Sequence, residues 1–121
     1  MARVSFTEAL LGVKEALGKE GFGVLTEIDV QETLKKKLKV NFQSYVILGA
    51  CNPTLVHQAL VIEPAIGLLL PCNVVVTEAP NGDVVVSVID PQIMFSILKQ
   101  PALEAIAGEA RTRLRRVLES L

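Results

Sequence analysis

The stretch that decides the fold reads LLLPCNVVVTEAPNGDVVVSVI and spans residues 68–89. It contains two β-prone segments, residues 68–79 and 83–89, both rich in valine. Between them lies Asn81-Gly82, a dipeptide that favours the tight turns of β-hairpins. Pro80 allows a loop longer than two residues, so the register of the pair stays open. The stretch therefore predicts a hairpin of two antiparallel strands.

Helical and strand patterns alternate on either side of this hairpin. Apolar residues recur at helical spacing from Phe6 to Leu17, and again from Leu103 through Leu118 to Leu121. The predicted elements outside the hairpin are helices over residues 6–20, 29–38, 53–63 and from 101 onwards, a short helical segment after Pro91, and strands over residues 22–28 and 45–51. The sequence leaves open whether residues 2–6 form a short first strand. Together the hairpin and the long last helix favour an α+β fold, with helices on one face of a sheet that is antiparallel or mixed.

Composition narrows the class of protein. The chain has 121 residues, half of them hydrophobic, which suits one domain, residues 1–121, with a single core. A formal net charge of −1 and an aromatic content of 4% argue against nucleic-acid binding, which needs basic surfaces or stacking platforms. The N-terminal residues lack a secretory signal pattern, and the longest apolar run, residues 64–76, is too short to span a bilayer. Two cysteines are too few for a disulfide framework. We expect a cytoplasmic protein with reduced thiols and with neither nucleic acid nor membrane as a partner.

Two short segments that repeat a Cys-Asn pair form the candidate site. They read Cys51-Asn52-Pro53 and Pro71-Cys72-Asn73, and each lies where an apolar run meets a turn residue. We expect the two strand ends to converge, so that Cys51, Asn52, Cys72 and Asn73 line one small patch that binds a ligand. Asn52 also suits a helix N-cap in front of Pro53. Asn73 lies in a predicted strand, where asparagine is uncommon, and it would need hydrogen-bond partners if it were buried.

Three interpretations of the two thiols are open. Cysteines at strand ends are commonly inert packing residues. Cys51 precedes a predicted helix, whose dipole could lower the pKa of the thiol and make it reactive. Cys51, Cys72 and His57 could also form a three-ligand set for a soft metal such as zinc or copper. No Walker loop, nucleophile elbow or CxxC motif occurs, so the sequence assigns no enzyme activity, catalytic residue or cofactor.

Four segments carry a resemblance to a known family: residues 21–30, 47–53, 59–60 and 66–74, which include the motifs GACNP and GLLLPCNV. On these segments the chain resembles domain-of-unknown-function family 302 of bacteria and archaea, from about residue 6 to the C-terminus. The resemblance implies a compact α+β domain with a curved antiparallel sheet, helices on one side and a TATA-binding-protein-like architecture. It also implies a homodimer, and it implies no activity, ligand or catalytic residue. Such proteins are expected to begin with a full strand, for which only residues 2–6 are available.

Three functions from different classes fit these observations. The leading hypothesis is a cytoplasmic homodimer that binds a small molecule or a partner at the Cys-Asn patch. The first alternative is a thiol-redox or metal-binding protein that uses Cys51 and Cys72. The second alternative is a structural or interaction module, in which the two motifs set turns and pack the core.

Overall fold

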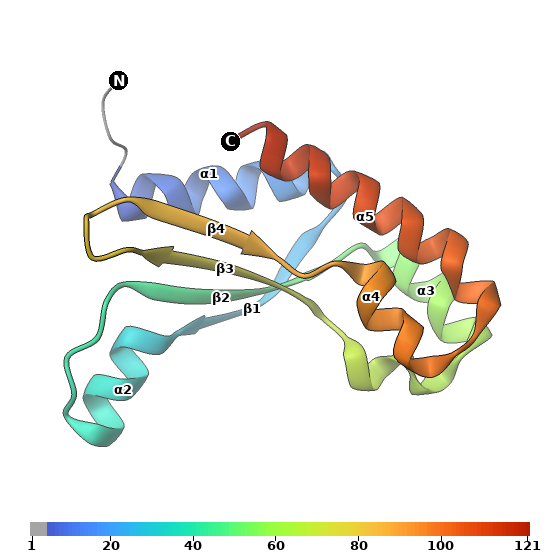
Figure 1. Cartoon of the computed structure of the whole chain (residues 1–121), viewed down its shortest axis with the longest axis horizontal. Coiled ribbons are helices and arrows are strands. Elements are labelled where there is room, and N and C mark those ends of the chain that lie inside the picture. The colour runs from blue at the N-terminus through green and yellow to red at the C-terminus, as the bar shows by residue number, and fades with distance from the viewer. Residues whose placement is uncertain (1–4) are drawn as a thin grey trace.

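The structure is a computed structural model that describes residues 5–121, a four-stranded antiparallel sheet with helices (Figure 1). The elements are, in chain order, α1 (Phe6–Lys19), β1 (Gly23–Asp29), α2 (Val30–Leu38), β2 (Tyr45–Cys51), α3 (Pro53–Ile62), the 3-10 helix η1 (Pro64–Leu69), β3 (Cys72–Glu78), β4 (Val84–Val88), α4 (Pro91–Phe95), the 3-10 helices η2 (Ser96–Leu98) and η3 (Pro101–Leu103), and α5 (Glu104–Glu119). Strand order in space equals chain order, and every neighbouring pair is antiparallel. The α+β fold is confirmed, and the sheet of the described residues is antiparallel throughout, not mixed.

The predicted short strand at residues 2–6 lies largely outside the described residues. Its last two positions are the N-cap and the first residue of a helix instead. Ser5 is the N-cap of α1, and its hydroxyl oxygen accepts a hydrogen bond from the backbone N–H of Glu8 at 3.1 Å. Phe6 is the first residue of α1.

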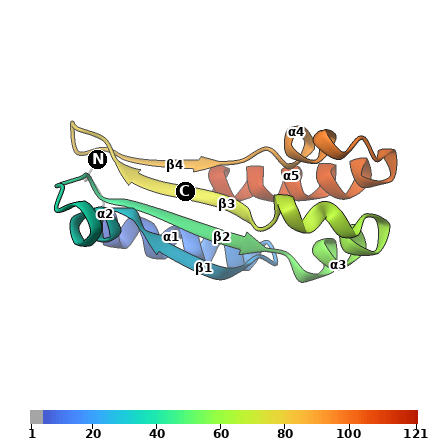
Figure 2. The same cartoon turned by 90° about the horizontal axis from the view of Figure 1, so that it is seen from below.

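The two long helices cover the same face of the sheet. Figure 1 shows α1 and α5 on one side of the strands, and Figure 2 shows the other side, where no helix of residues 5–121 lies over the middle of the sheet. One hydrophobic cluster fills the space between the sheet, α1 and the C-terminal half of α5, with Leu17, Leu48 and Val76 fully buried. Each large aliphatic side chain buried in this way contributes roughly 1.5–3 kcal/mol to folding.

A second hydrophobic cluster lies beyond the ends of β2 and β3. It joins α3, η1, α4 and the N-terminal half of α5, around Ile66, Phe95 and Leu103. Helix α5 thus packs against both clusters, which explains the length of its apolar stripe. The stripe ends at Val117, since Leu118 is 40% exposed and Leu121 is 54% exposed, contrary to the sequence prediction. Within residues 5–121, no helix combines the length and apolar character needed to cross a membrane.

The hairpin is confirmed, but its first strand begins at Cys72 and not at residue 68. Residues 68–69 belong to η1, which begins at Pro64 and ends when the backbone N–H of Leu70 donates to the carbonyl oxygen of Gly67 at 3.3 Å. Pro71 then has no N–H for the strand ladder. At the turn, Gly82 has a φ of 88°, and the backbone N–H of Ala79 donates to the carbonyl oxygen of Asp83 at 2.7 Å. The loop is therefore longer than two residues.

Candidate functional site

The two Cys-Asn segments lie side by side because β2 and β3 are neighbouring strands. In the register of this pair, Ala50 faces Cys72 and Gly49 faces Asn73. Successive side chains on a strand point to opposite faces of the sheet. Cys72 therefore points to the helix-covered side, as Ala50 does, and both are buried. Asn73 points to the uncovered side and is exposed, so its amide needs no partner inside the protein.

The side chains of Cys51 and Asn52 also lie on opposite sides of the sheet. Cys51 follows Ala50 on β2, so it belongs to the uncovered side, where it is half-buried. Asn52 leaves the strand and turns inward, with only 5% of its surface exposed. The strand ends converge, but they do not form one patch of four residues. Cys51 and Asn73 lie on one side of the sheet, and Asn52 and Cys72 lie on the other.

Asn52 ties three parts of the chain together. Its Oδ1 accepts a hydrogen bond from the backbone N–H of Leu55 at 3.2 Å, which caps α3. Its Nδ2 donates to the backbone carbonyl oxygen of Glu20, just after α1, at 3.4 Å. The same carbonyl accepts from Nη1 of Arg113 on α5 at 3.2 Å. Both polar ends of the buried amide are therefore satisfied, and Asn52 acts as a structural joint between α1, α3 and α5.

Gly49 and Pro71 explain why the two motifs accompany one another. The Pro71 ring packs over the place where a side chain of Gly49 would stand, and a Cβ added there would lie 2.7 Å from Pro71 Cγ and closer still to Thr26 Oγ1. Thr26 faces Gly49 from the other neighbouring strand, β1. Only glycine permits this close approach of three strand segments. The GAC and PCN motifs are thus complementary in shape, which gives them a structural role.

Neither thiol is activated. Burial raises the pKa of Cys51, contrary to the expected effect of the α3 dipole. Burial, with a smaller contribution from the nearby Cys51 thiol, raises the pKa of Cys72 to about 11. A thiol attacks as its thiolate, so both cysteines resemble packing residues more than nucleophiles.

We expect Cys72 to react very slowly with a disulfide reagent in the folded protein. A pKa of about 11 in place of 9.0 leaves roughly 100-fold less thiolate at neutral pH. The measurement is the rate of reaction with dithionitrobenzoate in a Cys51→Ala variant, which leaves Cys72 as the sole thiol. The control is the same variant in urea, where the rate should rise at least as much. A fast, stoichiometric reaction of the folded variant would show that the pKa of Cys72 is not raised.

The three proposed metal ligands do not come together. His57 is exposed on α3, Cys51 is half-buried at the end of β2, and Cys72 is buried. Among residues 5–121, no group of three or more histidine, cysteine, aspartate or glutamate side chains could hold a metal ion. The sequence-based metal set is therefore wrong for the described part of the chain.

Asn52 and Cys72 share a recess, but the recess is very small. It is lined by apolar residues of both hydrophobic clusters, including Phe22, Leu55 and Phe95, and has a volume of about 20 Å³. That is room for about one water molecule. A much larger hollow of about 450 Å³ lies on the other side of Phe95, which lines both.

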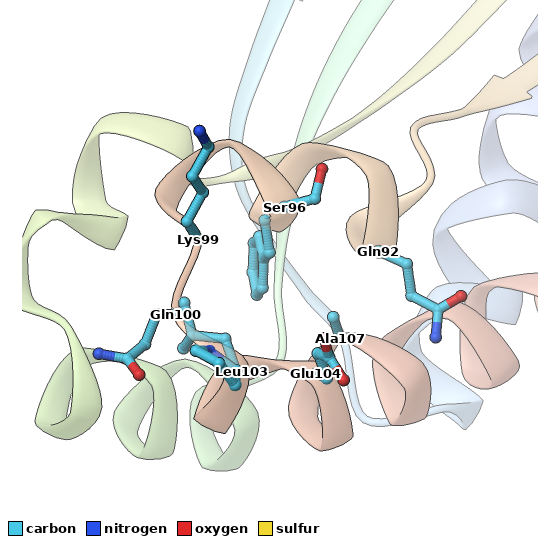
Figure 3. Close-up of a pocket in the computed structure, with 9 residues that line it drawn as sticks. Gln92, Ser96, Lys99, Gln100, Leu103, Glu104 and Ala107 are labelled. Carbon is cyan, nitrogen blue, oxygen red and sulfur yellow. The ribbon is translucent and has the colours of Figure 1, made fainter.

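The larger hollow, called the α4–α5 pocket here, lies between α4–η2 and the first turns of α5 (Figure 3). Its lining residues are Gln92, Phe95, Ser96, Lys99, Gln100, Pro101, Leu103, Glu104 and Ala107. Phe95, Leu103 and Ala107 are buried and give it an apolar floor. In Figure 3 the side chains of Lys99 and Ser96 point away from α5, so they form the rim.

Gln92 lines the α4–α5 pocket, and its side-chain amide is held by a hydrogen bond from α5. Its Oε1 accepts a hydrogen bond from Nη1 of Arg111 at 3.0 Å, and Arg111 also pairs with Asp90 at 3.3 Å. Because the oxygen is occupied, the amide Nε2 is available as a donor. It lies beside Gly108, where an added Cβ would be 3.3 Å away. The pocket thus combines an apolar floor with a glutamine amide at its edge.

Sequence reasoning missed the residues of this pocket. They have no shared motif and look like ordinary helix residues. The available signal was the pair of helix starts at Pro91 and Pro101, which implies a sharp corner between two helical segments. Lys99, with a φ of 51°, makes this corner.

Comparisons with known proteins agree with the fold. The model of a family described as "Domain of unknown function DUF302" matches residues 1–121. The chain is also similar to the crystal structure of an uncharacterized conserved DUF302 protein from Bacillus stearothermophilus. The identity is 32% and the TM-score 0.88, over 96% of this chain and 90% of that chain. No curated protein matches the chain.

Proposed function

The chain belongs to the DUF302 family, to which no activity is assigned, and from this premise we propose that it is a cytoplasmic homodimer that binds a small, largely apolar molecule in the α4–α5 pocket. The two free cysteines support a reducing compartment. The near balance of charges supports a role without nucleic acid or membrane as a partner.

The observation that carries the small-molecule proposal is the size and lining of the α4–α5 pocket. A volume of about 450 Å³ lies within the usual range of ligand sites, roughly 300–1,000 Å³. The apolar floor favours an aromatic or aliphatic body, and Gln92 Nε2 favours a ligand that carries an acceptor oxygen. The 20 Å³ recess beside Asn52 and Cys72 is too small to serve in its place.

We expect the fluorescent probe anilinonaphthalene sulfonate to bind the α4–α5 pocket at one site per chain. It has an apolar ring body and acceptor oxygens on its sulfonate. An Ala107→Leu variant would fill the floor of the pocket and should weaken binding at least about tenfold. The matched control is Ala105→Leu, an exposed position on the same helix, which should leave binding unchanged.

A second variant tests the same pocket without a change at position 107, which is buried and where a larger side chain could prevent folding. Gln92→Ala removes the side-chain amide and should weaken probe binding roughly fivefold, the value of one hydrogen bond. Circular dichroism confirms that each variant is folded. Equal binding by the wild type and Ala107→Leu, or no binding by the wild type, would refute the proposed site.

A further inference from the structure

Helix α2 and the loop that follows it form a basic corner of the molecule, called the α2 corner here and spanning residues 31–42. The corner contains four lysines and one glutamate, so its formal net charge is +3, while the whole chain carries −1. The rest of the chain therefore carries −4. Figures 1 and 2 show α2 at one end of the sheet and α4 at the other, where the α4–α5 pocket lies. Positive charge is thus concentrated away from that pocket.

Most of this positive charge has no partner within the described residues. Of the four lysines, only Lys36 forms an ion pair among residues 5–121, with Glu32 at 2.8 Å. Lys39 continues the group beyond the end of α2 and adopts the left-handed conformation, with a φ of 56°. Lys35, Lys37 and Lys39 are all exposed. The α2 corner therefore presents three cations that a negatively charged partner can reach.

Large apolar side chains are exposed among these lysines. Leu38 is 66% exposed, Val40 is 45% exposed and Phe42 is 39% exposed. The helix dipole accounts for lysines at the end of α2, but it gives no reason for apolar side chains in the same place to face water. Apolar groups surrounded by charged ones are instead typical of an interaction surface, which has an apolar centre and a polar rim.

A hollow of about 340 Å³ lies between α2 and the loop after it. Nε2 of Gln31 donates to the backbone carbonyl oxygen of Phe42 at 2.9 Å, which holds the loop against the helix. The Phe42 ring also contacts the ring of Tyr45 on β2, with centroids 6.1 Å apart. Because these contacts hold the loop in place, the hollow exists before a partner binds, which lowers the entropic cost of binding. Its lining residues are Gln31, Glu32, Lys35, Val40, Asn41 and Phe42.

We propose that the α2 corner binds an acidic segment of another protein. A bulky apolar side chain of the segment enters the hollow, and its carboxylates lie beside Lys35, Lys37 and Lys39. The inference goes beyond the proposed function and does not depend on the α4–α5 pocket. Carboxylates complement the unpaired ammonium groups and accelerate the encounter. Glu32 also lines the hollow, but its ion pair with Lys36 compensates its charge.

The charge distribution favours a short acidic segment over a larger polyanion. A membrane surface or a nucleic acid extends beyond the α2 corner, so its charge also meets the rest of the chain, which carries −4 and repels it. A short segment stays within roughly 10 Å of the lysines, the distance over which charges act at physiological salt. A concave hollow also suits an inserted side chain, whereas membrane binding buries protruding apolar residues in the lipid.

Fluorescence polarisation with a labelled peptide of sequence DEEFDLED tests the inference. The wild type should bind the peptide, and Lys35→Gln with Lys39→Gln should weaken binding at least about tenfold, because two charge-assisted contacts are lost. The matched control is Lys19→Gln with Arg115→Gln, two exposed positions on α1 and α5. This control removes the same charge elsewhere and should bind within about twofold of the wild type, because distant charges are screened.

A second pair of variants tests the apolar part of the α2 corner. Phe42→Ala removes one wall of the hollow and should weaken peptide binding at least about fivefold, because less apolar surface is buried. Its control is Leu11→Ala on α1, where the leucine is 60% exposed, and binding should not change. The peptide DEESDSED, which lacks the apolar side chains, should bind the wild type more weakly than DEEFDLED. Thermal melting checks that each variant is folded.

Each possible result supports or overturns the inference. Equal peptide binding by the wild type and the Lys35→Gln, Lys39→Gln variant would overturn it, and so would an equal loss in the matched control, since net charge alone would then explain binding. Absence of peptide binding by the wild type would overturn it as well. Vesicles of phosphatidylcholine and phosphatidylglycerol serve as the competing partner, and vesicle binding without peptide binding would assign the α2 corner to a membrane surface instead.

Discussion

Gly49→Ala is expected to destabilise the protein by about 3 kcal/mol, at the upper end of the range for overpacking. The added methyl group would meet the Pro71 ring at 2.7 Å and the Thr26 hydroxyl closer still, from both sides of β2. The Thr26 side chain can rotate away, but the Pro71 ring is held in the backbone. Relief therefore requires separation of β2 from β3, the central pair of the sheet. Since total stability for a domain is roughly 5–15 kcal/mol, a large share would be lost.

Urea unfolding followed by circular dichroism measures this loss. The matched control is Gly12→Ala, in the middle of α1, where an added Cβ meets nothing within 4 Å. This control should stabilise the protein by up to about 1 kcal/mol, because alanine is the better helix former. Thr26→Ala in the Gly49→Ala background removes one of the two clashes and should restore part of the stability. A loss below about 1 kcal/mol for Gly49→Ala would show that the strands yield easily.

Asn52→Ala is expected to cost about 2–3 kcal/mol. The change removes the cap of α3, which is worth about 1 kcal/mol, and leaves the buried N–H of Leu55 without its acceptor. It also removes the donor to the Glu20 carbonyl, which links α3 to α1. That carbonyl still accepts from Arg113, which limits the loss.

Two further variants distinguish the stability that comes from capping α3 from the stability that comes from the hydrogen bond between Asn52 and Glu20. Ser5→Ala removes an exposed N-cap without a tertiary hydrogen bond and should cost only about 0.5–1 kcal/mol in the same urea experiment. Asn52→Asp keeps an oxygen for the N–H of Leu55 but loses the Nδ2 donor, so its loss should lie between the other two. If Asn52→Ala costs no more than Ser5→Ala, then the bond to Glu20 contributes nothing to stability.

Much of the fold could be predicted from local patterns. The Asn52-Pro53 and Asp90-Pro91 signals mark the starts of α3 and α4, and Asp29 caps α2 through the backbone N–H of Glu32 at 2.9 Å. Each signal acts over a few residues, so its effect is contained in the sequence nearby. The prediction failed at residues 68–71, where leucines read as a strand, because Pro64 and Pro71 favour a 3-10 helix that packs Ile66 into the second cluster.

The candidate site was less accessible to prediction. The capping role of Asn52 was visible, since it depends on the helix that follows directly. Its bond to Glu20 was not, because that partner is 32 residues away. The α4–α5 pocket was not visible either, since its shape depends on how the corner at Lys99 folds Phe95 against Leu103.

By itself the sequence determined which segments become helices and strands, where most of them begin, and that β3 and β4 form a hairpin. Only the tertiary structure decided which side of the sheet each residue occupies. Runs such as Val74-Val75-Val76 are apolar at every position, so alternation alone could not say which side the helices cover. That choice follows from the pairing of β2 with β3 and from the packing of α1 and α5. Side chains alternate along a strand, so Cys72 lies in the core and Asn73 lies on the uncovered side. The pairing register between distant segments therefore fixes the side of every residue in the strand at once.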